Sequence, residues 1–152
     1  MATTTVVRTV PLDRHRAAEL IADFTTSAEW DPGVASARRL DDASDLEAGA
    51  RFHVDFRAGG LTLPLVYELT TYVPGALVVL ETRGRWHHGR DDVRLVPAET
   101  GGTRIEWRAT FGLRGPGRLV DPLLGRGFRR VAAHAGDGLA AFLARAAADH
   151  AG

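Results

Sequence analysis

Between Arg51 and Leu113 apolar and polar residues alternate with a period of two, and no run of helical spacing interrupts the alternation. In the segment RFHVDFRA, for example, Phe52, Val54 and Phe56 alternate with charged residues and a histidine. Successive side chains of a β-strand point to opposite faces of a sheet. The pattern therefore predicts strands with one buried face and one face in water, and the rest of the chain must cover the buried face.

Further strands are expected in the same region, and turns separate them. LTLPLVYELTTYV ends at a Pro-Gly turn and presents one apolar face, made of Leu61, Leu63, Leu65, Tyr67 and Leu69. GTRIEWRATFGL follows the turn ETGG and presents another, made of Ile105, Trp107, Ala109 and Phe111. ALVVLETRG is apolar at first, and its pattern does not decide which alternate side chains point inward. Consecutive strands joined by short loops form an antiparallel meander.

A long helix is expected after the strands, from about Asp121 to Ala148. Asp121 and Pro122 are typical of a helix start. Apolar or small residues then recur at steps of four and three, at Leu124, Phe128, Val131, Ala135, Gly138 and Phe142. At about 1.5 Å per residue the helix would be roughly 40 Å long and would cross a whole sheet. Small residues on this face, Ala132, Ala135 and Gly138, indicate either a cavity beneath the helix or a close contact with the strands.

The first forty residues are expected to form a strand and two short helices. Thr3 to Val10 is rich in β-branched residues, as strands are. Asp13 is a typical N-cap, and apolar residues at helical spacing follow it. In TTSAEWDPG a second helical turn is expected, capped by Ser27 and ended by the Pro-Gly pair, which leaves Trp30 beside the next segment, VASARRL.

The order of these elements resembles the helix-grip fold of the SRPBCC superfamily, and most of all its polyketide cyclase/dehydrase and lipid-transport group. Four motifs carry the resemblance and together span most of the chain: EWDPGVASARRL, YELTTYVPG, LVPAETGGTRIEW and LRGPGRLVDPLLGRGFRR. The resemblance implies an α+β fold in which a curved antiparallel sheet wraps around the long C-terminal helix, with an apolar cavity between them. The superfamily contains START-like lipid carriers, ligand sensors and enzymes, so the fold does not determine a reaction.

Composition limits the class of partner. The length of 152 residues suits one domain, residues 1–152. Nineteen basic residues, all arginine, balance nineteen acidic ones, so a nucleic-acid partner is not expected. Cysteine is absent, which excludes disulfides and thiolate metal sites, and no cofactor is expected. No stretch approaches the roughly 20 apolar residues of a bilayer span, so the expectation is a soluble cytoplasmic protein, monomeric or homodimeric.

The stretch GRWHHGRDDV holds more titratable groups than any other ten residues. His87 and His88 are adjacent on a strand, so they point to opposite faces and do not bind one metal together. Parity places His87 and Asp91 inward and leaves a charged outer row of His88, Arg90, Asp92 and Arg94. His87 is expected either at the sheet rim in contact with water or as a hydrogen-bonding group at a cavity mouth. Asp91 either reaches solvent or, if it is buried, must be paired or protonated.

Other polar candidates keep two interpretations each. The Tyr67 hydroxyl would bind a ligand carbonyl or hydroxyl, or be satisfied by a neighbour in the core. Trp30 and Trp107 are either core residues or surfaces for a ligand. Arg38 shares its parity with Leu40 and would meet an anionic or enolate oxygen if it lay inside, but it would lie on the surface otherwise.

Two functions remain open at this point. The first is binding of a small hydrophobic or aromatic ligand, polyketide-like or lipid-like. The second, which the resemblance implies, is a polyketide aromatase/cyclase acting on a poly-β-keto substrate in the same cavity. No Ser/His/Asp elbow, phosphate loop or HExxH motif is present, so any chemistry would use polar groups of the cavity. The residues expected to contact the ligand are Trp30, Arg38, Phe52, Val54, Phe56, Leu65, Tyr67, His87, Asp91, Trp107, Phe111, Phe128 and Ala135.

Overall fold

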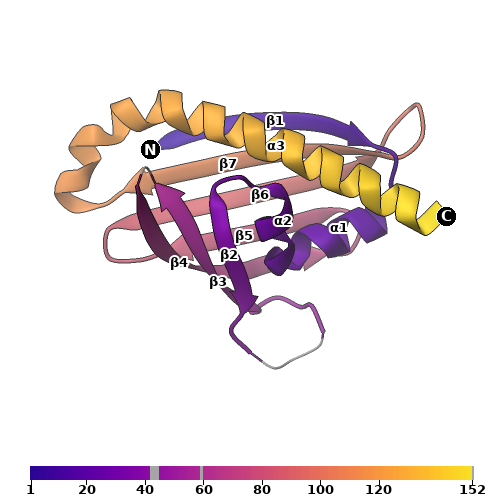
Figure 1. The fold of residues 1–152 in the computed structure, drawn as a ribbon, viewed down its shortest axis with the longest axis horizontal. Coiled ribbons are helices and arrows are strands. Elements are labelled where there is room, and N and C mark those ends of the chain that lie inside the picture. Colours follow the sequence, from indigo (N-terminus) through magenta and orange to yellow (C-terminus); the bar gives the residue numbers. More distant parts are fainter. Residues whose placement is uncertain (42–44, 59, 152) are drawn as a thin grey trace.

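A computed structural model describes residues 1–41, 45–58 and 60–151, with all their side chains except those of residues 58, 120–124, 126 and 150–151. Its seven strands are β1 (Ala2–Val10), β2 (Val34–Arg39), β3 (Arg51–Ala58), β4 (Leu61–Val73), β5 (Leu77–Arg83), β6 (His87–Pro97) and β7 (Thr103–Leu113). They form one antiparallel sheet in the order β1-β7-β6-β5-β4-β3-β2. The expected meander is confirmed from β2 to β7, and β1 adds to its edge beside β7 (Figure 1).

The helices lie on one side of this sheet. After β1 come α1 (Arg14–Ala22), the short 3-10 helix η1 (Phe24–Thr26) and α2 (Ser27–Trp30), and η2 (Gly115–Val120) leads into α3 (Asp121–Ala151). The 31 residues of α3 span about 46 Å at about 1.5 Å per residue, and the helix runs along the length of β1 and β7 (Figure 1). Within the described parts of the chain, no helix combines the length and the hydropathy needed to cross a bilayer. The predicted helix-grip arrangement is confirmed.

Two of the predicted N-cap residues can be compared with the structure, at the starts of α1 and α2. The carboxylate of Asp13 accepts hydrogen bonds from two backbone N–H groups of the first turn of α1, at 3.0 and 3.2 Å, so this cap is confirmed. The Ser27 cap is wrong. Because η1 runs directly into α2, Thr26 occupies the cap position, and the Ser27 hydroxyl donates back to the carbonyl of Phe24 at 2.7 Å. The predicted cap at Asp121 falls on a side chain outside the described ones.

Glycines let α3 approach its neighbours closely. A Cβ atom on Gly138 would overlap the carbonyl oxygen of Trp30, and one on Gly136 would lie 2.5 Å from a methyl group of Val6. Only glycine therefore fits where α3 crosses α2 and β1. Of the two interpretations offered for the small residues of this helix, close contact holds for Gly138. Ala132 and Ala135 instead face a cavity, which is described below.

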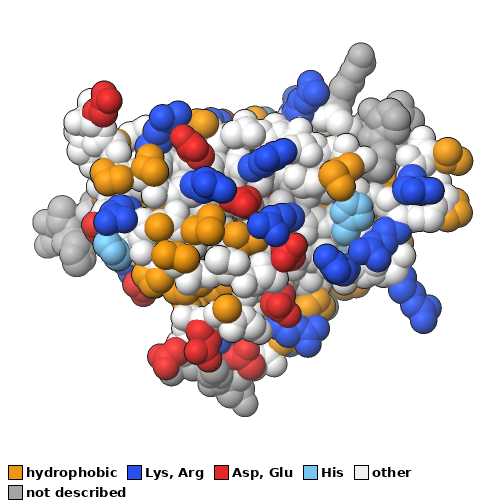
Figure 2. Space-filling model, turned by 180° about the vertical axis from the view of Figure 1, so that it is seen from behind, with side chains coloured by type: hydrophobic (Ala, Val, Ile, Leu, Met, Phe, Trp, Pro, Cys, Tyr) orange, Lys and Arg blue, Asp and Glu red, His pale blue; other side chains and the backbone are white. Residues whose placement is uncertain are grey.

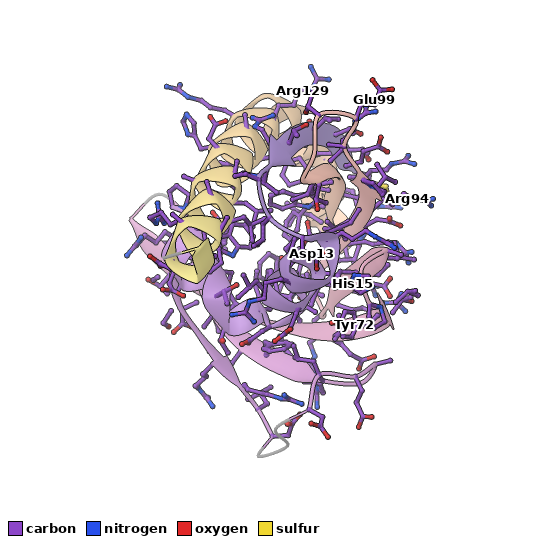
Figure 3. All side chains as sticks on the ribbon, turned by 90° about the vertical axis from the view of Figure 1, so that its right-hand side faces the viewer. Asp13, His15, Tyr72, Arg94, Glu99 and Arg129 are labelled. Atoms are coloured by element: carbon purple, nitrogen blue, oxygen red, sulfur yellow. The ribbon has the colours of Figure 1, made fainter. Side chains whose placement is uncertain are left out.

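The outer face of the sheet is a solvated charged surface. Figure 2 shows arginine and acidic side chains interspersed over this face. Arg90 lies 3.3 Å from Glu81 and 3.4 Å from Asp92, and Arg94 lies 3.6 Å from Asp92. In Figure 3 the Arg94 side chain points away from the side of the molecule on which α3 lies. The predicted outward parity of this row is confirmed, so the ionisable groups relevant to a ligand must lie on the other face.

Candidate ligand cavity

A cavity of about 760 Å³ lies between the curved sheet and α3. Strands β3, β4, β6 and β7 supply its walls, and α3 covers it with Phe128, Val131, Ala132 and Ala135. Pockets for small molecules typically measure about 300 to 1,000 Å³ and are lined mainly by apolar side chains. The size and the walls of this cavity fall within that description.

Ten of the thirteen predicted residues line the cavity. They are Trp30, Val54, Phe56, Leu65, Tyr67, Asp91, Trp107, Phe111, Phe128 and Ala135. Most of them lie on strand or helix faces whose inward side was readable from the sequence, and their contact with a ligand stays a prediction. The other three, Arg38, Phe52 and His87, lie elsewhere.

Arg38 lies on the exposed outer face of β2, opposite His53 in the register with β3. The inward alternative depended on a shared parity with Leu40, which is itself 40% exposed, so the surface interpretation of Arg38 holds. A β-bulge between Val34 and Ser36 changes the parity along this strand. Arg38 therefore does not face the cavity.

Phe52 and His87 are buried behind the cavity wall. Phe52 is fully buried in the core, with its ring 6.3 Å from that of Phe24. His87 is 5% exposed, stacks on Phe111 at 6.1 Å, and shares a hydrogen bond of 3.1 Å between its Nε2 atom and the Thr82 hydroxyl. Neither interpretation of His87 holds, since it neither touches water at the rim nor lines the cavity.

The ring of His87 is neutral near pH 7. Burial lowers its pKa, and the charges of Arg114 and His88 lower it further. Its Nδ1 atom has no hydrogen-bond partner among the described residues. His87 thus acts as a packed polar group that supports the position of Phe111.

Asp91 is the central polar group of the cavity. It lies in the middle of β6, and its Oδ1 atom accepts a hydrogen bond of 2.8 Å from the indole N–H of Trp107. Burial raises the pKa of Asp91 to about 7. The hydrogen bond from Trp107 lowers this pKa, and the negative charge of Asp31 raises it. Of the two interpretations, the inward one is right. Asp91 is partly buried on the cavity wall and hydrogen-bonded to Trp107, without an ion pair among the described residues, and near neutral pH it exists in both protonation states.

Asp31 is a second carboxyl on the cavity wall, and the sequence did not indicate it. It follows α2 directly, and its Oδ1 atom accepts a hydrogen bond of 2.8 Å from the backbone of Gly33. Burial raises the pKa of Asp31, and this hydrogen bond lowers it. The motif WDPG is typical of a turn, in which aspartate has a structural role, so only its position next to Trp30 could have drawn attention to it.

Tyr67 completes the polar group. Burial raises its pKa well above the ordinary value, and the negative charges of Asp91 and Asp31 raise it further, so the phenol keeps its proton. Its ring lies 4.9 Å from that of Phe24, and no hydrogen bond to its hydroxyl is found within the described part of the chain. The hydroxyl is therefore available to a ligand as donor and as acceptor.

All three tryptophans of the chain line the cavity. Trp30 and Trp107 meet edge to face with ring centroids 5.7 Å apart, and the indole N–H of Trp30 donates to the Thr26 hydroxyl at 3.1 Å. Trp86 is 40% exposed and thus borders solvent. Trp30 and Trp107 belong to the core and to the cavity wall at once, so both predicted interpretations describe part of their position.

The described residues contain no group of three or more histidine or acidic side chains arranged to hold a metal ion. The ionisable side chains on the described cavity wall are Asp31, Arg57, Tyr67 and Asp91. Arg57 is exposed, and its guanidinium donates to the backbone carbonyl of Pro32 at 3.1 Å. The chemistry that this site offers is therefore hydrogen bonding and proton exchange by two carboxyls and a phenol.

A curved sheet that grips a C-terminal helix over an apolar cavity defines a helix-grip fold. The family model described as polyketide cyclase/dehydrase and lipid transport matches residues 1–147, and the chain belongs to this family. The predicted resemblance is confirmed. A search of curated proteins finds no significant match.

Solved structures share the whole fold at low identity. A protein from Thermus thermophilus superposes with a TM-score of 0.76 at 17% identity, covering 95% of this chain and 98% of the other. A START superfamily protein from Mycobacterium smegmatis gives 0.73 at 13%, covering 95% and 99%. The Zhui aromatase/cyclase from Streptomyces sp. R1128 gives 0.74 at 12%, covering 94% and 93%. At such identities the likeness concerns the fold alone.

Proposed function

We propose that the chain binds a small, largely apolar molecule, polyketide-like or lipid-like, in the cavity between the sheet and α3. The supporting observation is the cavity of about 760 Å³ itself. Protein interiors are otherwise packed to the density of organic crystals, and an unfilled apolar void lowers stability. A cavity of this size beneath a long helix is best explained by a ligand that occupies it.

The wall offers the ligand both apolar and polar contacts. Phe111 and Phe128, whose rings stack at 6.5 Å, suit an apolar body, whereas Asp91 and Tyr67 suit a polar group. The proposal describes one domain of residues 1–152 that works in the cytoplasm, as a monomer or homodimer, without cofactor or nucleic acid.

Filling the cavity tests this function. Ala135 is 2% exposed and lines the cavity, so Ala135→Trp should occupy the space of the ligand and lower the affinity for N-phenyl-1-naphthylamine, an uncharged fluorescent probe, at least tenfold. Because the new ring fills a void, the thermal unfolding midpoint should change little. Ala141→Trp, on an exposed position of the same helix, is the matched control. Unchanged binding by Ala135→Trp, together with marked destabilisation, would show that the site is close-packed.

A second candidate function is aromatase/cyclase-type catalysis on a poly-β-keto substrate. It is supported by Asp91, whose pKa of about 7 suits proton transfer at neutral pH, and by Tyr67 on the same cavity wall. The Asp91 carboxylate would accept a proton from the carbon between two carbonyls, and the Tyr67 hydroxyl would hydrogen-bond the enolate oxygen. A solved neighbour of the same fold is named an aromatase/cyclase.

Tyr67→Phe separates the two candidates. In a binding protein the change should weaken affinity by about 0.5 to 1.5 kcal/mol, the usual net value of one neutral hydrogen bond. In a cyclase it should reduce turnover of a poly-β-keto mimic about a hundredfold while binding persists. We expect the modest loss of affinity, and a collapse of turnover with intact binding would make the protein an enzyme.

A further inference from the structure

Among the described residues, the two carboxyls of the cavity have no balancing cation. In the described part of the chain neither Asp31 nor Asp91 forms an ion pair, and each has a single hydrogen bond, from Gly33 and Trp107 respectively. The one basic side chain on the described wall, Arg57, is exposed and is directed to a backbone carbonyl. Carboxyls removed from water are normally paired with a positive group or kept protonated, because their charge is costly in a low dielectric.

Aromatic rings line the same space. Trp30 and Trp107 meet edge to face beside the carboxyls, and Trp86 and the Phe24–Tyr67 pair line the wall as well. The faces of such rings attract cations, most strongly in sites that exclude water. Apolar walls alone would suit any hydrophobic molecule, whereas rings combined with two unpaired carboxyls discriminate in favour of positive charge.

We propose that the ligand is an amphiphilic amine, whose protonated nitrogen binds to Asp31, Asp91 and the Tyr67 hydroxyl while its alkyl or aromatic body fills the remaining cavity. This inference rests on the proposed function, since it names the ligand class for the same cavity. A primary ammonium has three N–H donors. One Oδ atom of each aspartate is engaged by the protein, so the other Oδ of each and the phenol oxygen supply three acceptors.

An amine and a neutral ligand have opposite effects on the proton of Asp91. The titratable and charged groups that share the cavity with Asp91 are Asp31 after α2, Tyr67 on β4 and Arg57 on β3, and the described lining residues of α3 and β7 are uncharged. Since burial holds the pKa of Asp91 at about 7, an ammonium must displace a proton from it, whereas a carbonyl or hydroxyl ligand that accepts a hydrogen bond retains that proton. Affinity for an amine should therefore rise with pH, and affinity for a neutral acceptor should fall.

The test compares n-octylamine with 1-octanol, which share one alkyl chain. Quenching or enhancement of tryptophan fluorescence reports binding directly, because all three tryptophans line the cavity. At pH 8 octylamine should bind at least tenfold more tightly than octanol. Between pH 6 and pH 8 its affinity should rise about tenfold, in step with the ionised fraction of a group of pKa about 7.

Asp91→Asn should abolish both the preference for the amine and its pH dependence, while Asp92→Asn, on the outer face of the same strand, should change neither. Asp31→Asn is a second variant, expected to lower octylamine affinity at least fivefold and to lower it more than octanol affinity. Equal or tighter binding of octanol, or octylamine affinity that falls as pH rises, would overturn the amine class and leave the binding function intact. Failure of octylamine, octanol and N-phenyl-1-naphthylamine alike would overturn both.

Discussion

The most quantitative consequence of the cavity concerns the stability of Asp91→Asn. The amide has the shape of the protonated carboxyl, and its oxygen can still accept the hydrogen bond from Trp107, but it never carries a charge. The pKa of Asp91 rises from 3.8 to about 7 in the folded protein, a difference of about three units. At about 1.4 kcal/mol per unit, ionising this carboxyl in the folded state costs up to about 4 kcal/mol.

The sign of the effect follows from proton binding. Between about pH 4 and pH 7 folded Asp91 holds a proton that the unfolded chain has lost, so its contribution to stability falls as pH rises and reaches its minimum above pH 7. Asp91 is only half-buried, which lets water reach the charge and reduces the effect. We expect Asp91→Asn to be more stable than the wild type by no more than about 1 kcal/mol at pH 4.5 and by about 2 to 4 kcal/mol at pH 8.

Urea unfolding followed by tryptophan fluorescence at pH 4.5, 6, 7 and 8 measures this difference, provided that the m-values of the two proteins agree. Asp92→Asn is the control, since its carboxylate lies on the solvated face beside Arg90 and Arg94. Its stability relative to the wild type should show no gain as pH rises. If the gain of Asp91→Asn is the same at pH 4.5 and pH 8, or is larger at pH 4.5, the carboxyl does not sit in a low-dielectric cavity and the reasoning fails.

Two further predictions concern close packing and the boundary of the site. Gly138→Ala should destabilise the protein by about 1 to 3 kcal/mol in the same urea assay, because its Cβ would overlap the carbonyl of Trp30, whereas Gly125→Ala, with nothing within 4 Å, should stabilise α3 by up to about 1 kcal/mol. An unharmed Gly138→Ala would mean that α2 and α3 are not in close contact. Arg38→Ala should bind N-phenyl-1-naphthylamine within twofold of the wild type, and a larger loss would place Arg38 in the site.

The sheet and the long helix were predictable because their signals are local. The alternation in RFHVDFRA identifies the buried face of a strand. The apolar residues at steps of four and three, which include Phe128 and Ala135, identify the buried face of a helix. Once sheet and helix face each other, those faces must form the core or a cavity wall. The alternation cannot decide between the two, which is why Trp107 turns out to belong to both.

The errors arose where position depends on contacts between elements. The bulge in β2 leaves Val34 buried but puts Arg38 and Leu40 on the exposed face, and no residue type announces it. Gly138 and Ala135 look equivalent in the helical stripe, yet one faces the backbone of α2 and the other an open space. Asp31 reaches the cavity because of the turn that follows α2, so its role depends on the placement of the whole turn against the sheet.

The central claim is that a ligand occupies the space between the sheet and α3. A crystal structure of the protein grown with N-phenyl-1-naphthylamine tests it most directly. The account predicts ring density under Ala135, bounded by Trp107 and Phe128, with the amine nitrogen of the probe directed to the side of Asp91 and Tyr67. Density for the probe on the outer face alone, with side chains closing the space beneath Ala135, would contradict the account.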